Sequence, residues 1–199
     1  MGLSLQKGQG LSLTKQDGSS MTQVRLGLGW DAAEKPRKGF LSGLLGGGTA
    51  EIDLDASAIL YNAGHQALDT VFFNQLASKD GSIRHTGDNL TGAGEGDDET
   101  IMVNLPAVNT AVQHIVFVIT SYSQQTFNQV QNAFCRVLDD SVGGSPEVAR
   151  YTLTEQGPYT GMIMAKLSRE GAGWKFTAIG QPANGRTVGD LVAPATAVL

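Results

Sequence analysis

The sequence has little cysteine and no long apolar run. Cys135 is the single cysteine among 199 residues, so an intrachain disulfide is impossible and a reducing compartment is indicated. No run approaches the roughly 18 apolar residues of a membrane-spanning helix, and the first residues do not follow the pattern of a secretory signal. We therefore expect a cytoplasmic protein with no segment inserted into a membrane.

Charged residues are also scarce, and basic ones more than acidic ones. They make up 17% of the chain, and 14 Lys and Arg stand against 19 Asp and Glu, for a net charge of −5. A surface that binds phosphates needs a basic patch, and the sequence contains none. Nucleic acid is therefore not an expected partner.

Motifs for catalysis are missing as well. The chain has no Gly-x-Ser-x-Gly elbow and no His-Glu-x-x-His motif, and its three histidines, His65, His85 and His114, do not have the spacing of zinc ligands. The glycine-rich residues 43–48 are not followed by the Gly-Lys-Ser/Thr of a phosphate loop. The sequence therefore predicts a protein that is not an enzyme.

Glycine is abundant, and it separates short segments that alternate between apolar and polar residues. The 26 glycines predict many turns and hence strands. Residues 22–30 place Val24, Leu26 and Leu28 on one face, and the continuously apolar residues 115–119 predict a central strand covered on both faces. Further strands are expected at 71–76, 101–105, 135–138, 151–153, 161–167 and 174–179.

Turns and short helices complete the expected fold. The repeat of residues 3–7 in residues 11–15, across Gly8-Gln9-Gly10, predicts a hairpin, and Gly171-Ala172-Gly173 predicts another. Short helices are expected at 106–112, 126–133 and 187–192. Two stacked sheets bury such strands most simply, so we expect one mainly all-β domain over residues 1–199, a two-sheet β-sandwich with a few short helices and a glycine-rich surface loop at 34–50.

One predicted strand carries two carboxylates. In residues 52–60, the apolar side chains alternate and share one face, so Asp53 and Asp55 share the other, about 7 Å apart. Asp31 and Asn74 stand at the ends of two other predicted strands. These oxygen-bearing side chains are candidate ligands from outside the acidic loop described next.

The segment 85–99 contains five carboxylates and four glycines, and no Lys or Arg occurs from 85 to 135. Crowded carboxylates repel one another. Calcium relieves that repulsion, because it takes six to eight oxygens from carboxylates, amides and backbone carbonyls, and glycines let the backbone curl so that its carbonyls point inward. Magnesium keeps more of its waters, so calcium is favoured.

The spacing within this loop is not that of an EF-hand, because Leu90 and Gly92 occupy its third and fifth positions when counting starts at Asp88. A solvated acidic turn remains the alternative. The oxygen donors suffice for two calcium ions. The candidate ligands are Asp31, Asp53, Asp55, Asn74, Asp88, Asn89, Gly94, Glu95, Gly96, Asp97, Asp98 and Glu99.

Other hypotheses belong to different functional classes. Paired acids are compatible with a calcium-supported hydrolase or a lectin-like sandwich. Cys135 lies among apolar residues, which favours a structural thiol over a redox-active one. Asp139 and Asp140 form either a turn or additional ligands for a second ion.

Several segments together resemble the TerD family of tellurium-resistance and stress-response proteins. The segments that carry the resemblance are Gly29-Trp30-Asp31, residues 53–57, residues 85–99, Asn132-Ala133-Phe134-Cys135-Arg136-Val137 and Glu147-Val148-Ala149-Arg150-Tyr151. The TerZ branch of the family is indicated by the loop 38–48, by Thr154-Glu155-Gln156-Gly157 and by Trp174-Lys175-Phe176-Thr177-Ala178.

The resemblance implies a two-sheet β-sandwich that binds calcium at the acidic loop. It also implies a cytoplasmic bacterial protein, peripheral at the inner face of the membrane, that acts with sibling Ter proteins and a membrane-bound Ter partner. The implied role is a non-enzymatic scaffold in resistance to tellurite and other stresses.

Overall fold

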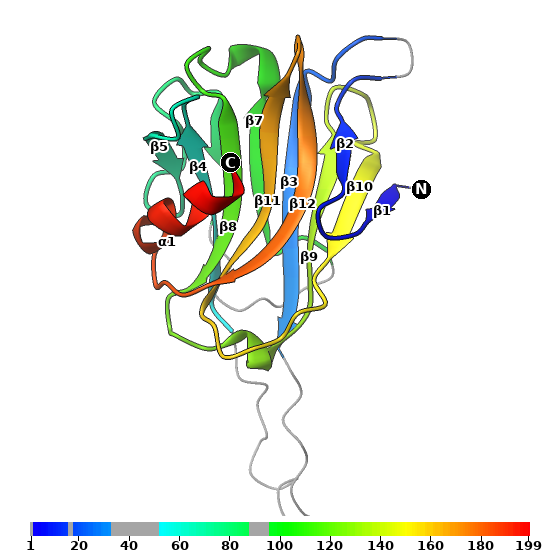
Figure 1. Ribbon diagram of the computed structural model, residues 1–199. Coiled ribbons are helices and arrows are strands. Elements are labelled where there is room, and N and C mark those ends of the chain that lie inside the picture. The colour runs from blue at the N-terminus through cyan, green and yellow to red at the C-terminus, as the bar shows by residue number, and fades with distance from the viewer. Residues whose placement is uncertain (1, 16–17, 33–51, 88–95) are drawn as a thin grey trace, which may run out of the picture.

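The computed structural model describes residues 2–15, 18–32, 52–87 and 96–199, and these form two six-stranded sheets packed face to face (Figure 1). The expected β-sandwich is confirmed. The strands are β1 (Leu3–Leu5), β2 (Gly10–Ser12), β3 (Gln23–Ala32), β4 (Leu54–Tyr61), β5 (Ala67–Val71), β6 (Ile83–His85), β7 (Glu99–Asn104), β8 (His114–Ser121), β9 (Val130–Asp139), β10 (Glu147–Thr152), β11 (Gly161–Glu170) and β12 (Gly173–Ala183). The helical elements are η2 (Leu105–Ala107), η3 (Phe127–Gln129), α1 (Val188–Ala195) and η4 (Thr196–Val198).

The first sheet has the strand order β1-β10-β9-β3-β7-β6, and the second has the order β2-β12-β11-β8-β4-β5. Paired strands are antiparallel, except that β1 runs parallel to β10. The hairpin expected at 171–173 is present, since β11 and β12 pair down to Glu170 and Gly173. The predicted loop at 34–50 lies outside the described residues.

The hairpin expected for residues 3–15 is wrong. Leu3 pairs with Ala149 in the first sheet, whereas Leu11 pairs with Phe176 in the second. The chain crosses between the sheets at a turn in which Gly8 has a φ of 81°, a conformation that glycine adopts without strain. Strands of three residues gain more from extending two long sheets than from pairing only with each other.

The core lies between the two sheets. Val24, Leu26 and Leu28 of β3 point into it and are buried, as the alternation predicts. From the second sheet, Leu54 and Ala56 of β4 are fully buried on the facing side. The period of two therefore identified the inner face of both strands correctly.

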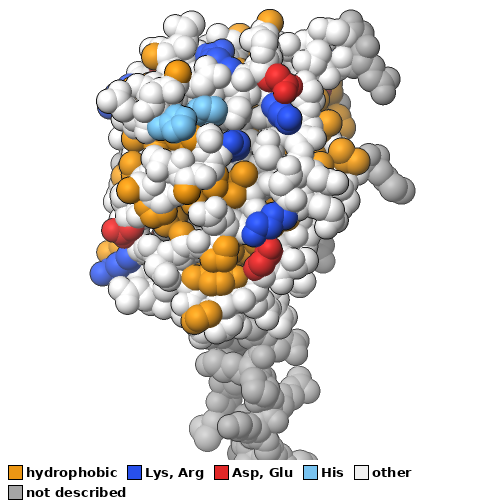
Figure 2. Space-filling view, viewed as in Figure 1, with side chains coloured by type: hydrophobic (Ala, Val, Ile, Leu, Met, Phe, Trp, Pro, Cys, Tyr) orange, Lys and Arg blue, Asp and Glu red, His pale blue; other side chains and the backbone are white. Residues whose placement is uncertain are grey.

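The outer face of the second sheet is covered by the carboxyl-terminal helix α1 (Figure 1). Leu191 of the helix is fully buried in a cluster that contains Ile59 of β4, Val116 of β8 and Ile163 of β11. The helix starts with a capping box between Thr187 and Asp190, close to the predicted start. The outward residues of β4 beyond Asp55 are thus buried and not solvated. Figure 2 shows hydrophobic side chains gathered on this side of the molecule with few charges.

Three shorter predictions need correction. The helix expected at 126–133 is only the single turn η3, because β9 begins at Val130 and pairs with β3 and β10. The helix at 106–112 reduces to η2. The strand at 71–76 is displaced: β5 ends at Val71, and residues 72–75 form a turn that is closed by backbone hydrogen bonds of 3.0 and 2.9 Å between Phe72 and Gln75.

Candidate metal centre

Five strand ends meet at one end of the sandwich. The end of β3 lies beside the start of β7, since Leu28 pairs with Glu99, and beside the start of β9, since Asp31 pairs with Gln131. The end of β6 lies on the other side of β7. The start of β4 approaches from the second sheet through a hydrogen bond to Glu99. The predicted carboxylates therefore come from elements that do converge here.

Asp97 points to the outer face of the first sheet, where Arg136 of β9 binds it with two hydrogen bonds. Nε donates to Oδ1 at 2.7 Å and Nη2 donates to Oδ2 at 3.0 Å. These hydrogen bonds raise the pKa of the Arg136 guanidinium, although partial burial opposes them. Arg136 also contacts Glu147 at 3.3 Å, and Arg150 holds Glu147 from the other side at 2.9 Å. Asp97 is thus the end of an ion-pair chain across β9 and β10.

Two glycines of β3 make this arrangement possible. A Cβ on Gly27 would lie 2.1 Å from the Asp97 carboxyl carbon, and one on Gly29 would lie 2.5 Å from the Phe134 ring and 2.7 Å from the Gly96 carbonyl oxygen. Residues 96–97 can therefore lie across the outer face of β3 only because that face has no side chains there. The sequence signal was present in the alternation of leucine and glycine over residues 26–29, and the sequence analysis missed it.

Asp98 turns towards the end of β3. Its backbone N–H donates to the Leu28 carbonyl at 2.9 Å, and its Oδ2 accepts from the Trp30 N–H at 2.8 Å. Burial raises the pKa of Asp98, and the negative charges of Asp31, Glu99 and Asp97 raise it further, against the opposing effect of the Trp30 hydrogen bond. A carboxylate in this setting carries charge that its surroundings disfavour.

Glu99 points into the interior and joins the two sheets. Its side chain is 1% exposed, and its Oε2 accepts from the Ala56 N–H of β4 at 2.7 Å. His85 Nε2 lies 3.1 Å from the same oxygen. Because His85 Nδ1 accepts from the Gly87 N–H at 3.1 Å, Nε2 is the ring nitrogen that donates to Glu99. His85 is therefore a hydrogen-bonding partner of Glu99.

Three consecutive carboxylates thus enter three different surroundings. Asp97 lies on the outer face, Asp98 at the strand end and Glu99 in the interior. Glu99 points inward together with Ile101, as the alternation within β7 requires, whereas Asp97 precedes the strand and does not follow that alternation.

The remaining predicted ligands differ in their exposure and in their position on the strands. Asp31 is exposed and accepts from Asn132 Nδ2 at 2.7 Å. Asp55 is buried, 5% exposed, on β4 beside Ala56, and Asp53 is half-buried just before that strand. Asn74 is exposed in the turn after β5. Gly96 leads into the Asp97 contact, and the predicted ligands Asp88, Asn89, Gly94 and Glu95 lie outside the described residues.

Within the described ranges, which omit residues 88–95, no group of three or more His, Cys, Asp or Glu side chains is arranged to hold a metal ion. A cavity of about 410 Å³ borders this region, lined by Trp30, Asp31, Gly96, Asp98 and Asn132 among others. Its carboxylates and amides are oxygen donors of the kind that calcium uses. The calcium site stays a prediction that depends on oxygens contributed by residues 88–95.

The alternative hypothesis of a redox-active thiol finds no support here. Cys135 is fully buried on β9, and burial, with a smaller contribution from Asp97, raises its pKa to about 12. A thiol in that state is not the thiolate that reacts.

Asp139 and Asp140 are also accounted for by ion pairs. Lys15 lies 3.2 Å from Asp139, and Arg25 lies 2.9 Å from Asp140.

Among the described residues, no helix is long and apolar enough to cross a membrane.

Comparison with known proteins identifies the family. The TerD domain matches residues 1–193. The chain is 46% identical to the tellurium resistance protein TerZ of Serratia marcescens over 189 residues, which cover 95% of this chain and 94% of that protein. It is 39% identical to the stress response protein SCP2 of Bacillus subtilis (strain 168), over 97% of this chain and 98% of that one.

The fold has relatives among solved structures. The crystal structure of a homologue of the telluride resistance protein TerD from Streptomyces coelicolor A3(2) aligns with a TM-score of 0.66 at 20% identity, covering 87% of this chain and 96% of that chain. That likeness concerns the fold alone. The sandwich, its acidic end and the sequence matches together place this chain in the TerD family, whose named members include tellurium-resistance and stress-response proteins.

Proposed function

We propose that this protein is a calcium-binding, non-enzymatic scaffold in bacterial tellurite resistance and the general stress response. Its relatives carry the names of tellurium-resistance and stress-response proteins. Several different Ter proteins are among them, so sibling Ter proteins are the proposed partners. The proposed setting is the cytoplasm, with peripheral contact to a membrane-bound Ter partner.

The observation that carries the calcium proposal is the charge around Asp98. Burial and three neighbouring carboxylates raise its pKa, and the Trp30 backbone N–H that donates to it is a neutral group. A divalent cation bound there would remove the repulsion and favour the ionised form. Asp31, which adds to this charge, is the second proposed ligand on this side.

Asp97 contributes differently from what the sequence suggests. Its carboxylate already accepts two hydrogen bonds from Arg136. Its main role in this proposal is to fix residues 96–98 across Gly27 and Gly29, so that residues 88–95 are joined to a rigid segment. A preorganised loop end lowers the ordering cost of binding an ion.

We place a second ion at the same end of the sandwich, where β4 approaches β7. Its proposed ligands are Glu99 on β7, Asp55 on β4 and Asp53 just before β4, and the Glu99 carboxylate accepts a hydrogen bond from the Ala56 N–H of β4 at 2.7 Å. Calcium there would tie the two sheets together at one end. Because calcium needs six to eight oxygens, both proposed sites draw on residues 88–95.

The test is thermal unfolding of EGTA-stripped protein, with and without millimolar calcium, against the same concentration of magnesium. Ligand at a hundred times its dissociation constant adds about 2.7 kcal/mol, which raises the melting temperature of a chain this long by roughly 5 to 10 °C. We expect that shift with calcium and little with magnesium.

Two variants locate the effect. Asp98→Asn keeps an oxygen for the Trp30 N–H but removes the charge, and we expect the calcium shift to fall to a small fraction. Glu170→Gln removes a carboxylate from an exposed ion pair with Lys175 and should keep the full shift. No shift in the wild type, or equal shifts in both variants, would overturn the proposed site. The scaffold role is tested separately by light scattering of mixtures with a sibling Ter protein, with calcium or EGTA.

A further inference from the structure

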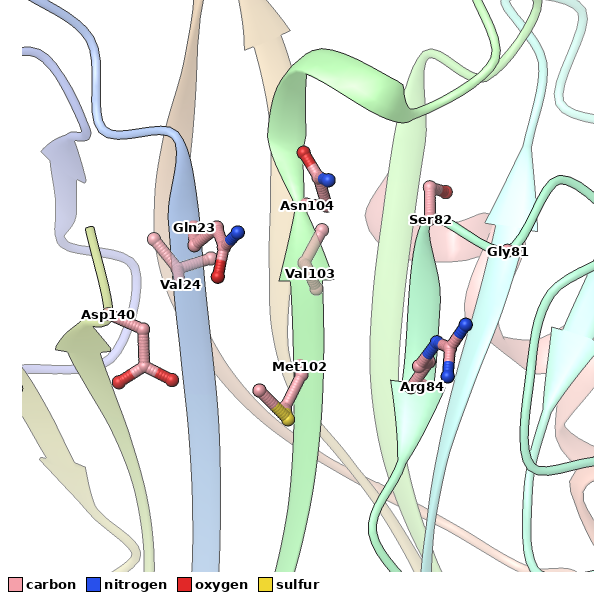
Figure 3. A pocket seen from close by; sticks show the side chains of 9 residues that line it. All are labelled: Gln23, Val24, Gly81, Ser82, Arg84, Met102, Val103, Asn104 and Asp140. Carbon is pink, nitrogen blue, oxygen red and sulfur yellow. The ribbon is translucent and has the colours of Figure 1, made fainter.

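A second cavity, of about 250 Å³, opens on the outer face of the first sheet between β3, β7 and β6 (Figure 3). It lies near the start of β3, where Gln23 pairs with Asn104 of β7. The acidic centre lies at the other end of β3, at Trp30 and Asp31. The proposed calcium site therefore does not account for this cavity.

A row of side chains crosses the sheet under the cavity. Met102 of β7 is the register partner of Arg25 on β3 and of Arg84 on β6, so the three project on the same face. Figure 3 shows Met102 on β7, with Asp140 to one side and Arg84 to the other. The cavity thus has an apolar floor between two charged walls, an arrangement typical of small-molecule sites.

One wall contains a buried acceptor that lacks a donor. The Asp140 side chain is 7% exposed. Its Oδ2 accepts a hydrogen bond from Arg25 Nε at 2.9 Å and forms an ion pair with Arg25 Nη2 at 2.9 Å. Its Oδ1 is buried and, in the part of the chain that the structure describes, has no hydrogen-bond partner. Buried carboxylate oxygens are normally satisfied, and an exception calls for an explanation.

The other wall contains a cation that is not neutralised. Arg84 is exposed, and its guanidinium makes no ion pair or side-chain hydrogen bond with any residue in the described ranges. Arg25 and Asp140 neutralise each other, so Arg84 leaves the cavity with one net positive charge. An anionic group of a ligand would pair with it through two parallel hydrogen bonds.

We infer that this cavity binds a short zwitterion of the size of a di- or tripeptide, whose ammonium group donates to Asp140 Oδ1 and whose carboxylate pairs with Arg84. The end of β9 and β6 are three strand spacings apart, about 14 Å, so a ligand that reaches both walls is longer than a free amino acid. The amides of Gln23 and Asn104, which line the cavity, suit the peptide bonds between the two ends. Because Oδ1 is buried, the inference requires the side chains that cover it to move when the ligand binds.

The experiment is an amide-resolved NMR titration of the full chain with trialanine up to 20 mM, in EGTA and again in calcium. We expect shifts at Ser82, Arg84, Met102 and Asn104 in both conditions, because the cavity is separate from the acidic centre. Trialanine that is acetylated at its amino end, or amidated at its carboxyl end, should bind at least about tenfold more weakly, since each change removes the charge from one end of the ligand and with it the charge-assisted hydrogen bonding there.

Variants assign the two ends of the ligand. Arg84→Gln should weaken binding of trialanine about tenfold and make it insensitive to amidation, whereas Lys79→Gln, at a 78% exposed lysine outside the cavity, should bind as the wild type does. Asp140→Asn should remove the sensitivity to acetylation, with folding checked from its NMR spectrum. Absence of shifts at 20 mM, shifts elsewhere on the chain, or unchanged binding by folded Arg84→Gln would each overturn the inference.

Discussion

The two outer faces of the sandwich differ sharply, although the sheets contain equal numbers of strands. The second sheet is covered by α1, so β4 and β8 are buried on both faces. The outer face of the first sheet has no such cover among the described elements. It presents the ion pairs of Arg136, Asp97 and Glu147, two glycines of β3 and the cavity between Asp140 and Arg84.

This difference shows how one fold separates stability from binding. Apolar side chains on the covered face gain free energy from burial. The open face keeps charged groups in contact with water, and it can offer them to ions or small molecules. We therefore expect substitutions on the covered face to change stability, and substitutions on the open face to change mainly what is bound.

The largest expected effect comes from breaking the covered face. Leu191 of α1 is fully buried, and Leu191→Ala should lower the free energy of unfolding by about 3 kcal/mol, because it leaves a cavity over β8. Met102→Ala, on the open face, should cost under about 1 kcal/mol. Urea denaturation measures both variants, and equal losses would contradict the contrast between the two faces.

A smaller effect should come from filling the surface of β3 on the open face. A Cβ at position 27 would lie 2.1 Å from the Asp97 carboxyl carbon, so Gly27→Ala should displace Asp97 from Arg136. The two partners are 24% and 11% exposed, and we expect a loss of about 1 to 2 kcal/mol after allowing for solvent screening.

Two further variants check the cause of that loss. Gly143→Ala, where a Cβ would contact nothing within 4 Å, is the matched control and should be nearly neutral. In a double-mutant cycle, Asp97→Ala should relieve much of the cost of Gly27→Ala. Additive losses in this cycle would show that the clash lies elsewhere.

The smallest expected effect concerns Asp80, which lies in the turn that joins the two sheets. Its carboxylate accepts several hydrogen bonds, whereas that of Asp98 has other carboxylates near it. Burial raises its pKa, but hydrogen bonds from the hydroxyls of Ser78 and Ser82 and from the backbone N–H groups of Ser82 and Asn109 outweigh this and lower the pKa to about 2. The folded-state pKa lies below the ordinary value of 3.8.

The stability that Asp80 contributes should therefore be present above about pH 4 and disappear as the pH falls to about 2. Because the residue is exposed, we expect only about 1 kcal/mol after discounting for solvent. Urea denaturation of the wild type and Asp80→Asn, repeated from pH 6 to pH 2, measures it. A difference that stays constant over this range would contradict the assignment.

Parts of the fold and of the site were readable from local pattern. Alternation over residues 22–30 identified the inner face of β3, the continuous apolar run identified β8 as a strand covered on both faces, and the short helix expected at 187–192 overlaps α1. The acidic composition of 85–99 marked the end of the sandwich where the carboxylates gather. Each of these signals lies within a single element, and that is why the sequence alone reveals it.

The wrong predictions concern which strands pair with one another. Residues 3–5 and 10–12 alternate as strands, but their pattern does not say that they join different sheets. Residues 126–133 contain helix-like spacing, yet the edges of β3 and β10 offer the backbone from Val130 onward a longer ladder of hydrogen bonds. Tertiary pairing overrides local propensity wherever a segment is short.

The sequence by itself determined which residues face inward, that two sheets stack, and that one loop concentrates negative charge, because periodicity and composition act over a few neighbouring positions. Only the tertiary structure decided that Asp97 meets Arg136, that Glu99 joins the sheets, and that Asp140 and Arg84 flank one cavity. These contacts join positions far apart in the chain, and their geometry depends on strand register, which the side-chain alternation constrains only to within a shift of two residues.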